Sequence, residues 1–357
     1  TATPSTLATV LKNADPGAIV NLSAGEYGLL ELHGQKAYPE NCTIIGCDGA
    51  SVAGVSITSG VSSATLRTDT DISNATLPRG LAFRNVEFAN NFSLRNARID
   101  NLTLDTCHFA QDANINILPN CFKDGYGEDK KDGFWCTLRA DYFQLYPENI
   151  VIKDCTIESS ASSRGAIYII GCGDVTVCNN IIKDSAFNGI QIGGHSFSPY
   201  NVDVRGKITV TNNTILKSAS RSINLHTMND SEVSVFGNKM YSCGEPDEVI
   251  RVLGCTNSEF DFGGNDVLHI ANTYNDEVIS VDDKILVADT IPVSKAVQEE
   301  LDKKADNVEL DKKADKQEVE TALGSKMDKG VMLYNHPEDT DETGLNAWLE
   351  NAVLPTM

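Results

Sequence analysis

A short pattern of apolar and polar residues recurs between residues 150 and 267, and it constrains the fold more than any other feature. An apolar–polar–apolar triplet is followed by a turn containing Asn, Asp, Gly or Cys, and then by another apolar residue. The copies end at Ile157, Ile182, Ile215, Met240 and Val267. The steps between them are about 25, 33, 25 and 27 residues, a period typical of solenoids. A unit of this length cannot bury its own apolar face, so it has to stack on its neighbours.

A second strand is predicted in each repeat, after a loop. Alternation with period two places its flanking aliphatic side chains inward and its middle residue outward. These middle residues are Tyr168, Gln191, Asn224 and Arg251. Two or three short strands per turn with a polar corner predict an all-β fold, a right-handed parallel β-helix. A β-sandwich with Asn-rich turns is the alternative, but its strands would not recur with the same triplet and corner.

The corner that follows each triplet carries a residue suited to stacking on its equivalent in the next repeat. Asn amides can hydrogen-bond along such a stack, and Cys acts as a small apolar filler. We expect the following residues to lie near one another at successive corners: Cys155, Asn180, Asn213, Asn238 and Asn265. The chain contains ten cysteines. Because Cys107 and Cys155 occupy equivalent corners, we expect reduced thiols rather than disulfides.

The first residues predict a cap for one end of the solenoid. Residues 5–14 place Leu7 and Leu11 on one helical face, with Ser5 positioned to cap the helix. A Pro16-Gly17 turn, an aliphatic strand over residues 19–22 and a Gly-Glu-Tyr turn follow. In this order of elements the chain resembles the pectin lyase-like superfamily over about its first 290 residues. The resemblance implies the fold and leaves the chemistry open.

Four segments are expected along the chain. Residues 1–30 form the cap and first strand, and residues 31–290 form the β-helix. The repeat pattern is interrupted at about residues 111–148 by an insertion rich in aromatic residues, which include Trp135 and Tyr142. Long excursions on a rigid scaffold commonly carry binding sites. We therefore expect this insertion to lie beside a site on the β-helix.

Composition changes at residues 291–330, where apolar residues mostly recur three or four positions apart between charged ones. This spacing predicts an α-helical coiled coil whose chains must associate, because the apolar stripe is not stable alone in water. Its associating residues are Val297, Leu301, Val308, Val319 and Leu323. The repeats beginning at Leu301 and Leu310 resemble the Leu-x-x-Lys-Ala-Asp repeats of bacteriophage fibres, which implies a parallel homotrimer. Residues 331–357 are expected to be a linker or the start of a further module.

Charge and hydropathy exclude two classes of partner. The formal net charge is −21, so a nucleic acid or an anionic membrane surface would repel the chain. No apolar run approaches the roughly 18 residues of a transmembrane helix. We expect no nucleic-acid partner and no membrane insertion.

No motif in the sequence identifies a catalytic residue, a metal site or a cofactor. The acidic residues at 124, 128, 129 and 132 do not fit the spacing of a Ca²⁺ loop. Nucleophile elbows, zinc signatures and phosphate loops are absent from the sequence. The basic residues His195, Arg221, His226 and Arg251 lie near the outward row and could bind a carboxylated glycan or pair with neighbouring acids.

These features favour a bacteriophage fibre or spike protein that assembles in the host cytoplasm and resides in the virion. It would contact other virion proteins and a bacterial surface polysaccharide. The predicted glycan-binding residues are Tyr168, Gln191, Asn224 and Arg251, with Trp135 and Tyr142 along one side. One alternative is a polysaccharide depolymerase, either a lyase or a glycoside hydrolase. The other is a structural head or tail decoration protein without glycan binding.

Overall fold

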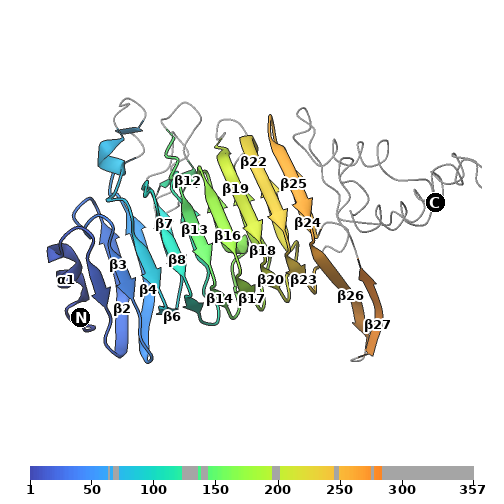
Figure 1. The fold of residues 1–357 in the computed structure, drawn as a ribbon, viewed down its shortest axis with the longest axis horizontal. Coiled ribbons are helices and arrows are strands. Elements are labelled where there is room, and N and C mark those ends of the chain that lie inside the picture. The colour runs from blue at the N-terminus through green and yellow to red at the C-terminus, as the bar shows by residue number, and fades with distance from the viewer. Residues whose placement is uncertain are drawn as a thin grey trace, which may run out of the picture.

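The computed structural model describes residues 1–62, 65–66, 72–122, 136–137, 144–194, 202–244, 249–274 and 277–283. These residues form an elongated rod of parallel strands in which successive coils of the chain stack along the long axis (Figure 1). Each coil contributes up to three strands. Each of these strands belongs to a different ladder, which is a row of paired strands from successive coils. The stacking predicted from the sequence repeat is therefore confirmed.

The first ladder, called sheet A, is a parallel sheet of nine strands with one strand from each coil. Its members in spatial order are β1 (Ile19–Asn21), β3 (Thr43–Ile45), β5 (Ala82–Arg84), β8 (Thr103–Asp105), β13 (Ile150–Lys153), β16 (Val175–Cys178), β19 (Val204–Thr211), β22 (Met228–Phe236) and β25 (Glu259–Gly263).

The second sheet has 16 strands and divides at β4 (Ala50–Thr58) into two parallel ladders. Ladder B continues through β6 (Glu87–Phe88), β9 (His108–Phe109), β14 (Thr156–Ile157), β17 (Ile181–Ile182), β20 (Thr214–Ile215), β23 (Lys239–Met240) and β26 (Asp266–Tyr274). Ladder C continues through β7 (Phe92–Arg95), β10 (Ile115–Leu118), β15 (Gly165–Ile170), β18 (Asn188–Gly193), β21 (Ile223–His226) and β24 (Ile250–Leu253). Strand β2 (Gly25–His33) pairs with β4 along both ladders.

Five further elements lie outside this stack. Helix α1 (Leu7–Asn13) and the 3₁₀ turn η1 (Ser73–Ala75) are short. Strands β11 (Cys121–Phe122) and β12 (Cys136–Thr137) form an antiparallel pair. Strand β27 (Glu277–Asp283) runs antiparallel to β26 and makes a hairpin at the last coil (Figure 1).

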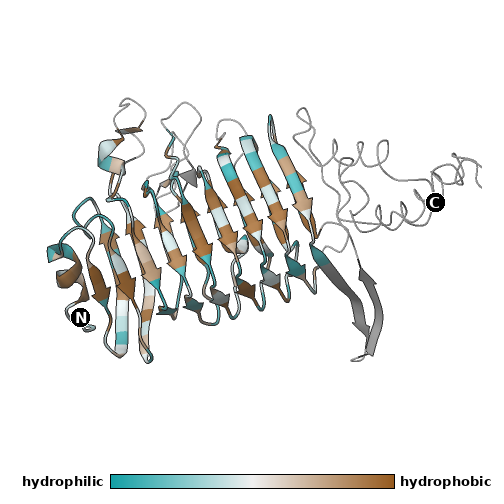
Figure 2. Ribbon diagram, viewed as in Figure 1, coloured by the Kyte–Doolittle hydropathy of each residue, from teal (hydrophilic) through white to brown (hydrophobic). Residues whose placement is uncertain are grey.

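The core fills the interior of the rod because aliphatic side chains point inward at alternate positions of the strands. In β13, for example, Ile150 and Ile152 are buried and the residues between them are partly exposed. Hydrophobic residues are concentrated in the strands and hydrophilic ones at the turns (Figure 2). Near the N-terminal end the interior is aromatic, with the Phe88 and Phe109 rings stacked at 4.9 Å between centroids. One continuous core thus extends along the stacked coils.

The corner between sheet A and ladder B holds the predicted Asn ladder. The Asn180 amide nitrogen donates to the Asn213 amide oxygen at 2.9 Å, and Asn213 donates in the same way to Asn238. The chain turns just before each Asn through a residue with positive φ, such as Asn179 at 56° and Asn212 at 55°. Asn tolerates this left-handed conformation better than most residues. The stacking predicted for the corner residues is confirmed.

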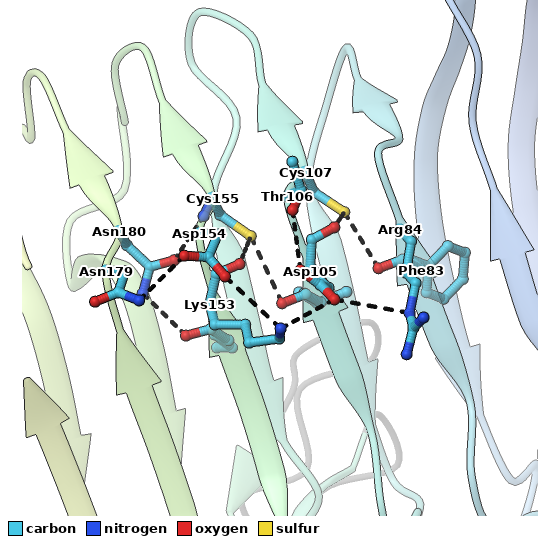
Figure 3. Close-up of polar contacts among 12 residues, drawn as sticks. Phe83, Arg84, Asp105, Thr106, Cys107, Lys153, Asp154, Cys155, Asn179 and Asn180 are labelled. Carbon is cyan, nitrogen blue, oxygen red and sulfur yellow. Dashed lines mark hydrogen bonds and ion pairs between the residues drawn. The ribbon is translucent and has the colours of Figure 1, made fainter.

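Two thiols continue the ladder toward the N-terminus. Asn180 donates its second amide hydrogen to the Ile152 carbonyl at 2.9 Å. In the preceding coils Cys155 donates to the Leu104 carbonyl at 3.7 Å and Cys107 to the Phe83 carbonyl at 3.5 Å (Figure 3). These carbonyls occupy the same register on adjacent strands of sheet A. Both cysteines are free thiols, as expected, and they replace Asn as donors to the same row of carbonyls.

Two expectations about local structure need correction. Helix α1 buries Leu7 and Leu11 against the first coil, but its N-cap is Thr6 rather than Ser5, and no side chain caps it. The insertion also starts later than the sequence suggested. Strand β10 lies within residues 111–148, yet it pairs in parallel with β7 and β15 as a regular member of ladder C. Its Ile-Asn-Ile-Leu sequence is too short to stand out without a following corner.

Candidate functional site

The outward row of ladder C places the predicted binding residues opposite one another. Tyr168 pairs in register with Gln191, Gln191 with Asn224, and Asn224 with Arg251. Adjacent strands lie about 4.8 Å apart, so the four side chains occupy a line about 15 Å long. The row continues toward the N-terminus through Asn116. The apolar–polar–apolar pattern around Asn116 in β10 is the sequence signal that could have identified this residue as a member of the row.

The row differs from the sequence expectation in its exposure. Tyr168 and Gln191 are each only 7% exposed and Arg251 is 9% exposed, whereas Asn224 is partly exposed. Part of the cover is a small apolar cluster of Leu118, Tyr168 and Ile170, which is separate from the main core. The ladder therefore presents a largely closed surface with polar groups set into it.

Gln191 lies at the centre of a hydrogen-bond network on this surface. Its amide oxygen accepts a bond from Asn188 at 2.8 Å, and its amide nitrogen lies 2.9 Å from Nε2 of His226. In this orientation the Gln191 amide nitrogen is the donor and Nε2 of His226 the acceptor. Gly193 makes room for this ring, because a Cβ at that position would lie 2.6 Å from two of its carbon atoms.

Tyr168 and Asn224 of the row differ in their capacity for hydrogen bonding. Burial raises the pKa of Tyr168 to about 12, so its phenol stays protonated and can donate a hydrogen bond near neutral pH. The amide oxygen of Asn224 is buried and has no hydrogen-bond partner. An unpaired buried acceptor costs free energy, so a donor brought to Asn224 would be favoured.

Acidic residues are absent from the ladder C strands β7, β10, β15, β18, β21 and β24. Glycoside hydrolases commonly use a pair of carboxylates flanking the scissile bond. The strands that carry the row do not supply such a pair. What they supply is amide, phenol and guanidinium groups, which can donate hydrogen bonds to hydroxyl or carboxylate oxygens.

A comparison with protein families fixes the class of fold. The model described as a right handed beta helix region matches residues 28–206 and 142–273, which together reach from residue 28 to residue 273 and exceed half of the chain. The chain belongs to the right-handed β-helix family. The all-β fold class and its hand, predicted from the repeats, are thereby confirmed. Comparisons with curated proteins and with solved structures gave no match.

A second polar cluster of the β-helix lies where ladder C returns to sheet A, and sequence reasoning missed it. Asp203 accepts hydrogen bonds from the Tyr146 hydroxyl, from Arg205 Nε at 3.0 Å and from Asn229 at 3.3 Å. The Arg205 guanidinium lies 5.0 Å from the centroid of the Tyr146 ring. Burial and the neighbouring Asp203 raise the pKa of Tyr146. The Asp-x-Arg spacing at the start of β19 was the available signal, but Tyr146 is 57 residues away from Asp203.

Within the part of the chain that the structure describes, no group of three His, Cys, Asp or Glu residues is arranged to hold a metal ion. Across the same residues, no helix has the length and apolar character needed to cross a membrane.

Several predicted residues lie outside the described part of the β-helix protein. These are Trp135 and Tyr142 of the insertion, His195, and the associating residues Val297, Leu301, Val308, Val319 and Leu323. Their roles stay predictions.

Proposed function

We propose that this β-helix protein is a fibre or spike protein of a bacteriophage virion, that it forms homotrimers, and that it binds a bacterial surface glycan along ladder C. The observation that carries the binding proposal is the in-register row from Asn116 to Arg251. Its side chains recur about every 4.8 Å along the rod. An extended polymer is the ligand that suits such a row, because each strand can contribute one polar contact.

The rest of the proposal rests on the shape and the sequence of the protein. A stack of parallel strands with a continuous core is stiff along its axis and suits a projecting rod. The Leu-x-x-Lys-Ala-Asp repeats that begin at Leu301 and Leu310 support trimer formation and a place in the virion. The acidic net charge of −21 argues for a ligand other than nucleic acid.

Binding without cleavage is favoured by the composition of ladder C. Its strands from β7 to β24 contain no carboxylate, and Asp203 in the neighbouring cluster already accepts three hydrogen bonds. A depolymerase is the second candidate, because the Tyr146, Asp203 and Arg205 cluster combines a phenol, a carboxylate and a cation. The oxygens of Asp203 are already engaged by Tyr146, Arg205 and Asn229, which makes this candidate the less favoured one.

The test compares Asn224→Ala with Thr214→Ala, which changes an outward residue of ladder B in the same coil. Both variants and the unmodified protein are applied to an array of purified bacterial capsular and lipopolysaccharide glycans. Asn224→Ala should lower binding about tenfold or more, and Thr214→Ala should leave it unchanged. If no glycan is bound by the unmodified protein, or if both variants bind equally well, the proposed glycan site is wrong.

Cleavage is measured in the same samples. Release of reducing ends or unsaturated uronates from a bound glycan would replace the binding function by a depolymerase function. In that case Asp203→Asn should abolish the release.

A further inference from the structure

We propose that the outer face of sheet A is the surface through which copies of this chain contact one another, so that sheet A faces the axis of the trimer. The partner is therefore a second copy of the same β-helix. This inference rests on the proposed trimer and goes beyond it, because a coiled coil alone does not determine which side of each rod faces inward.

Sheet A carries an outward row that is uncharged along most of the rod. Ile19 pairs with Thr43, and the row continues in register on every following strand. Its members from the second coil onward are Thr43, Ala82, Thr103, Val151, Thr176, Thr209 and Ser234, and the row ends on the last strand at the exposed Asp261. The members before Asp261 are small or β-branched and half-buried. Such side chains leave a flat surface against which another sheet can pack.

The neighbouring outward row carries charges that are partly compensated. Asp105 lies between two cations, 3.1 Å from Lys153 Nζ and 3.7 Å from Arg84 Nε (Figure 3). Further along this row the register positions are Cys178, Thr211 and Phe236, which are uncharged. A protein with a net charge of −21 repels its own copies, so an interface between copies has to lie where the acidic charge is absent or compensated.

Ladders B and C are less suited than sheet A to a contact between copies of the chain. Ladder B presents Glu158 with Lys183 at 2.8 Å and His108 at 2.9 Å, and it also presents Lys239 and Asp266 at opposed register positions. An interface on ladder B would have to remove these charges from water before any attraction is regained. On ladder C the outward row is already largely covered. Sheet A also carries charges at its C-terminal end, where Lys207, Glu232 and Glu259 lie in register. The uncharged stretch from Thr43 to Ser234 is therefore the part of sheet A that we assign to the contact.

An exposed apolar residue marks the same surface. Ile19 lies at the N-terminal end of the uncharged row and is 63% exposed, more than any other large hydrophobic residue that the structure describes. Nine strands at about 4.8 Å give sheet A a length of about 38 Å. With roughly four residues of about 3.3 Å across it, the flat footprint is about 500 Å². This is less than the roughly 800 Å² per partner of a standard interface, so the contact would act together with the coiled coil.

The test uses two threonines of the same coil in the full-length chain. Thr209 is outward on sheet A and Thr214 is outward on ladder B, and both are half-buried. Thr209→Lys should raise the concentration at which half of the trimer dissociates at least tenfold, because three lysines would meet near the axis. Thr214→Lys should leave that concentration unchanged. The added lysine lowers the net negative charge of the chain equally in both variants. A loss of trimer stability that is confined to Thr209→Lys therefore reports the local contact.

Photo-crosslinking gives a second readout that does not depend on stability. The photoreactive residue p-benzoylphenylalanine is placed at position 209 or at position 214, and covalent oligomers are separated on denaturing gels. Crosslinks between chains from position 209 and none from position 214 support the inference. A trimer that crosslinks through position 214 instead overturns it and leaves the proposed trimer intact. A chain that sediments as a monomer at all concentrations overturns both.

Discussion

The Asn213 amide oxygen accepts two hydrogen bonds from Asn180, one from its side-chain nitrogen at 2.9 Å and one from its backbone nitrogen at 3.0 Å. The same pair of bonds links Asn213 to Asn238 and Asn238 to Asn265. Each Asn also donates to a carbonyl of sheet A, so the amide groups inside the rod are satisfied. A break at one position therefore leaves polar groups unpaired in two neighbouring coils.

Asn213→Ala should lower the free energy of unfolding by about 2–4 kcal/mol, since each buried donor left without an acceptor costs about 1–3 kcal/mol. The control is Asn212→Gly, because Asn212 is exposed and has a φ of 55°, a conformation that Gly adopts freely. Urea unfolding followed by circular dichroism measures both. Equal stability of the two variants would show that the Asn ladder contributes little.

Gly193→Ala should destabilise the protein and disturb the outer side of ladder C. The added Cβ would lie 2.5 Å from the His226 backbone oxygen and 2.6 Å from its ring, so β18 and β21 would have to separate. We expect a loss of about 2–3 kcal/mol or more, in the range of overpacked sites. Gly28→Ala is the matched control, because a Cβ there meets no atom within 4 Å. The prediction fails if the two variants unfold at the same temperature.

The thiols should divide into two classes of reactivity. Burial raises the pKa of Cys42 to about 11 and that of Cys255 to about 12, and it also raises the pKa of Cys172. These groups stay protonated and inaccessible at pH 8, whereas Cys47 is exposed. A thiol-reactive dye followed by peptide mass spectrometry should label Cys47 in the native protein. Labelling of the other three should require denaturant, and rapid labelling of Cys172 without it would contradict the burial of the turn between β15 and β16.

Glu158 should contribute a small pH-dependent stability. Hydrogen bonds from Lys183, and then from His108, lower the pKa of this carboxyl below its ordinary value of about 4.3. Because the folded pKa is the lower one, the stabilisation is present above pH about 4.3 and is lost as the pH falls through the folded pKa. The side chains of Glu158, Lys183 and His108 are 34–46% exposed, so solvent screening should keep the contribution below about 1 kcal/mol.

Urea unfolding of the unmodified protein and of Glu158→Gln at pH 7 and pH 3 measures this contribution. The difference between the two proteins should be present at pH 7 and shrink at pH 3. A difference that is the same at both pH values would assign the effect of the substitution to packing rather than charge.

The sequence by itself determined the coil architecture, because its signals are local and repeated. Alternation of apolar and polar residues sets which side chains point inward, and the Asn or Cys after a left-handed residue sets each corner. These patterns were enough to predict the parallel stack, the neighbours of Asn180 and the in-register line from Tyr168 to Arg251. Strand β10 was missed because its short apolar run is not followed by a corner.

Only the tertiary structure decided how much of that line is exposed. Tyr168 alternates with aliphatic residues as an outward side chain should, yet it is covered, because Leu118 and Ile170 of ladder C pack beside it. The Asp203 cluster likewise required Tyr146 from a distant coil. Burial and hydrogen bonding on the outside of a solenoid depend on segments that are remote in sequence. A repeat pattern encodes only how each coil stacks on the next one.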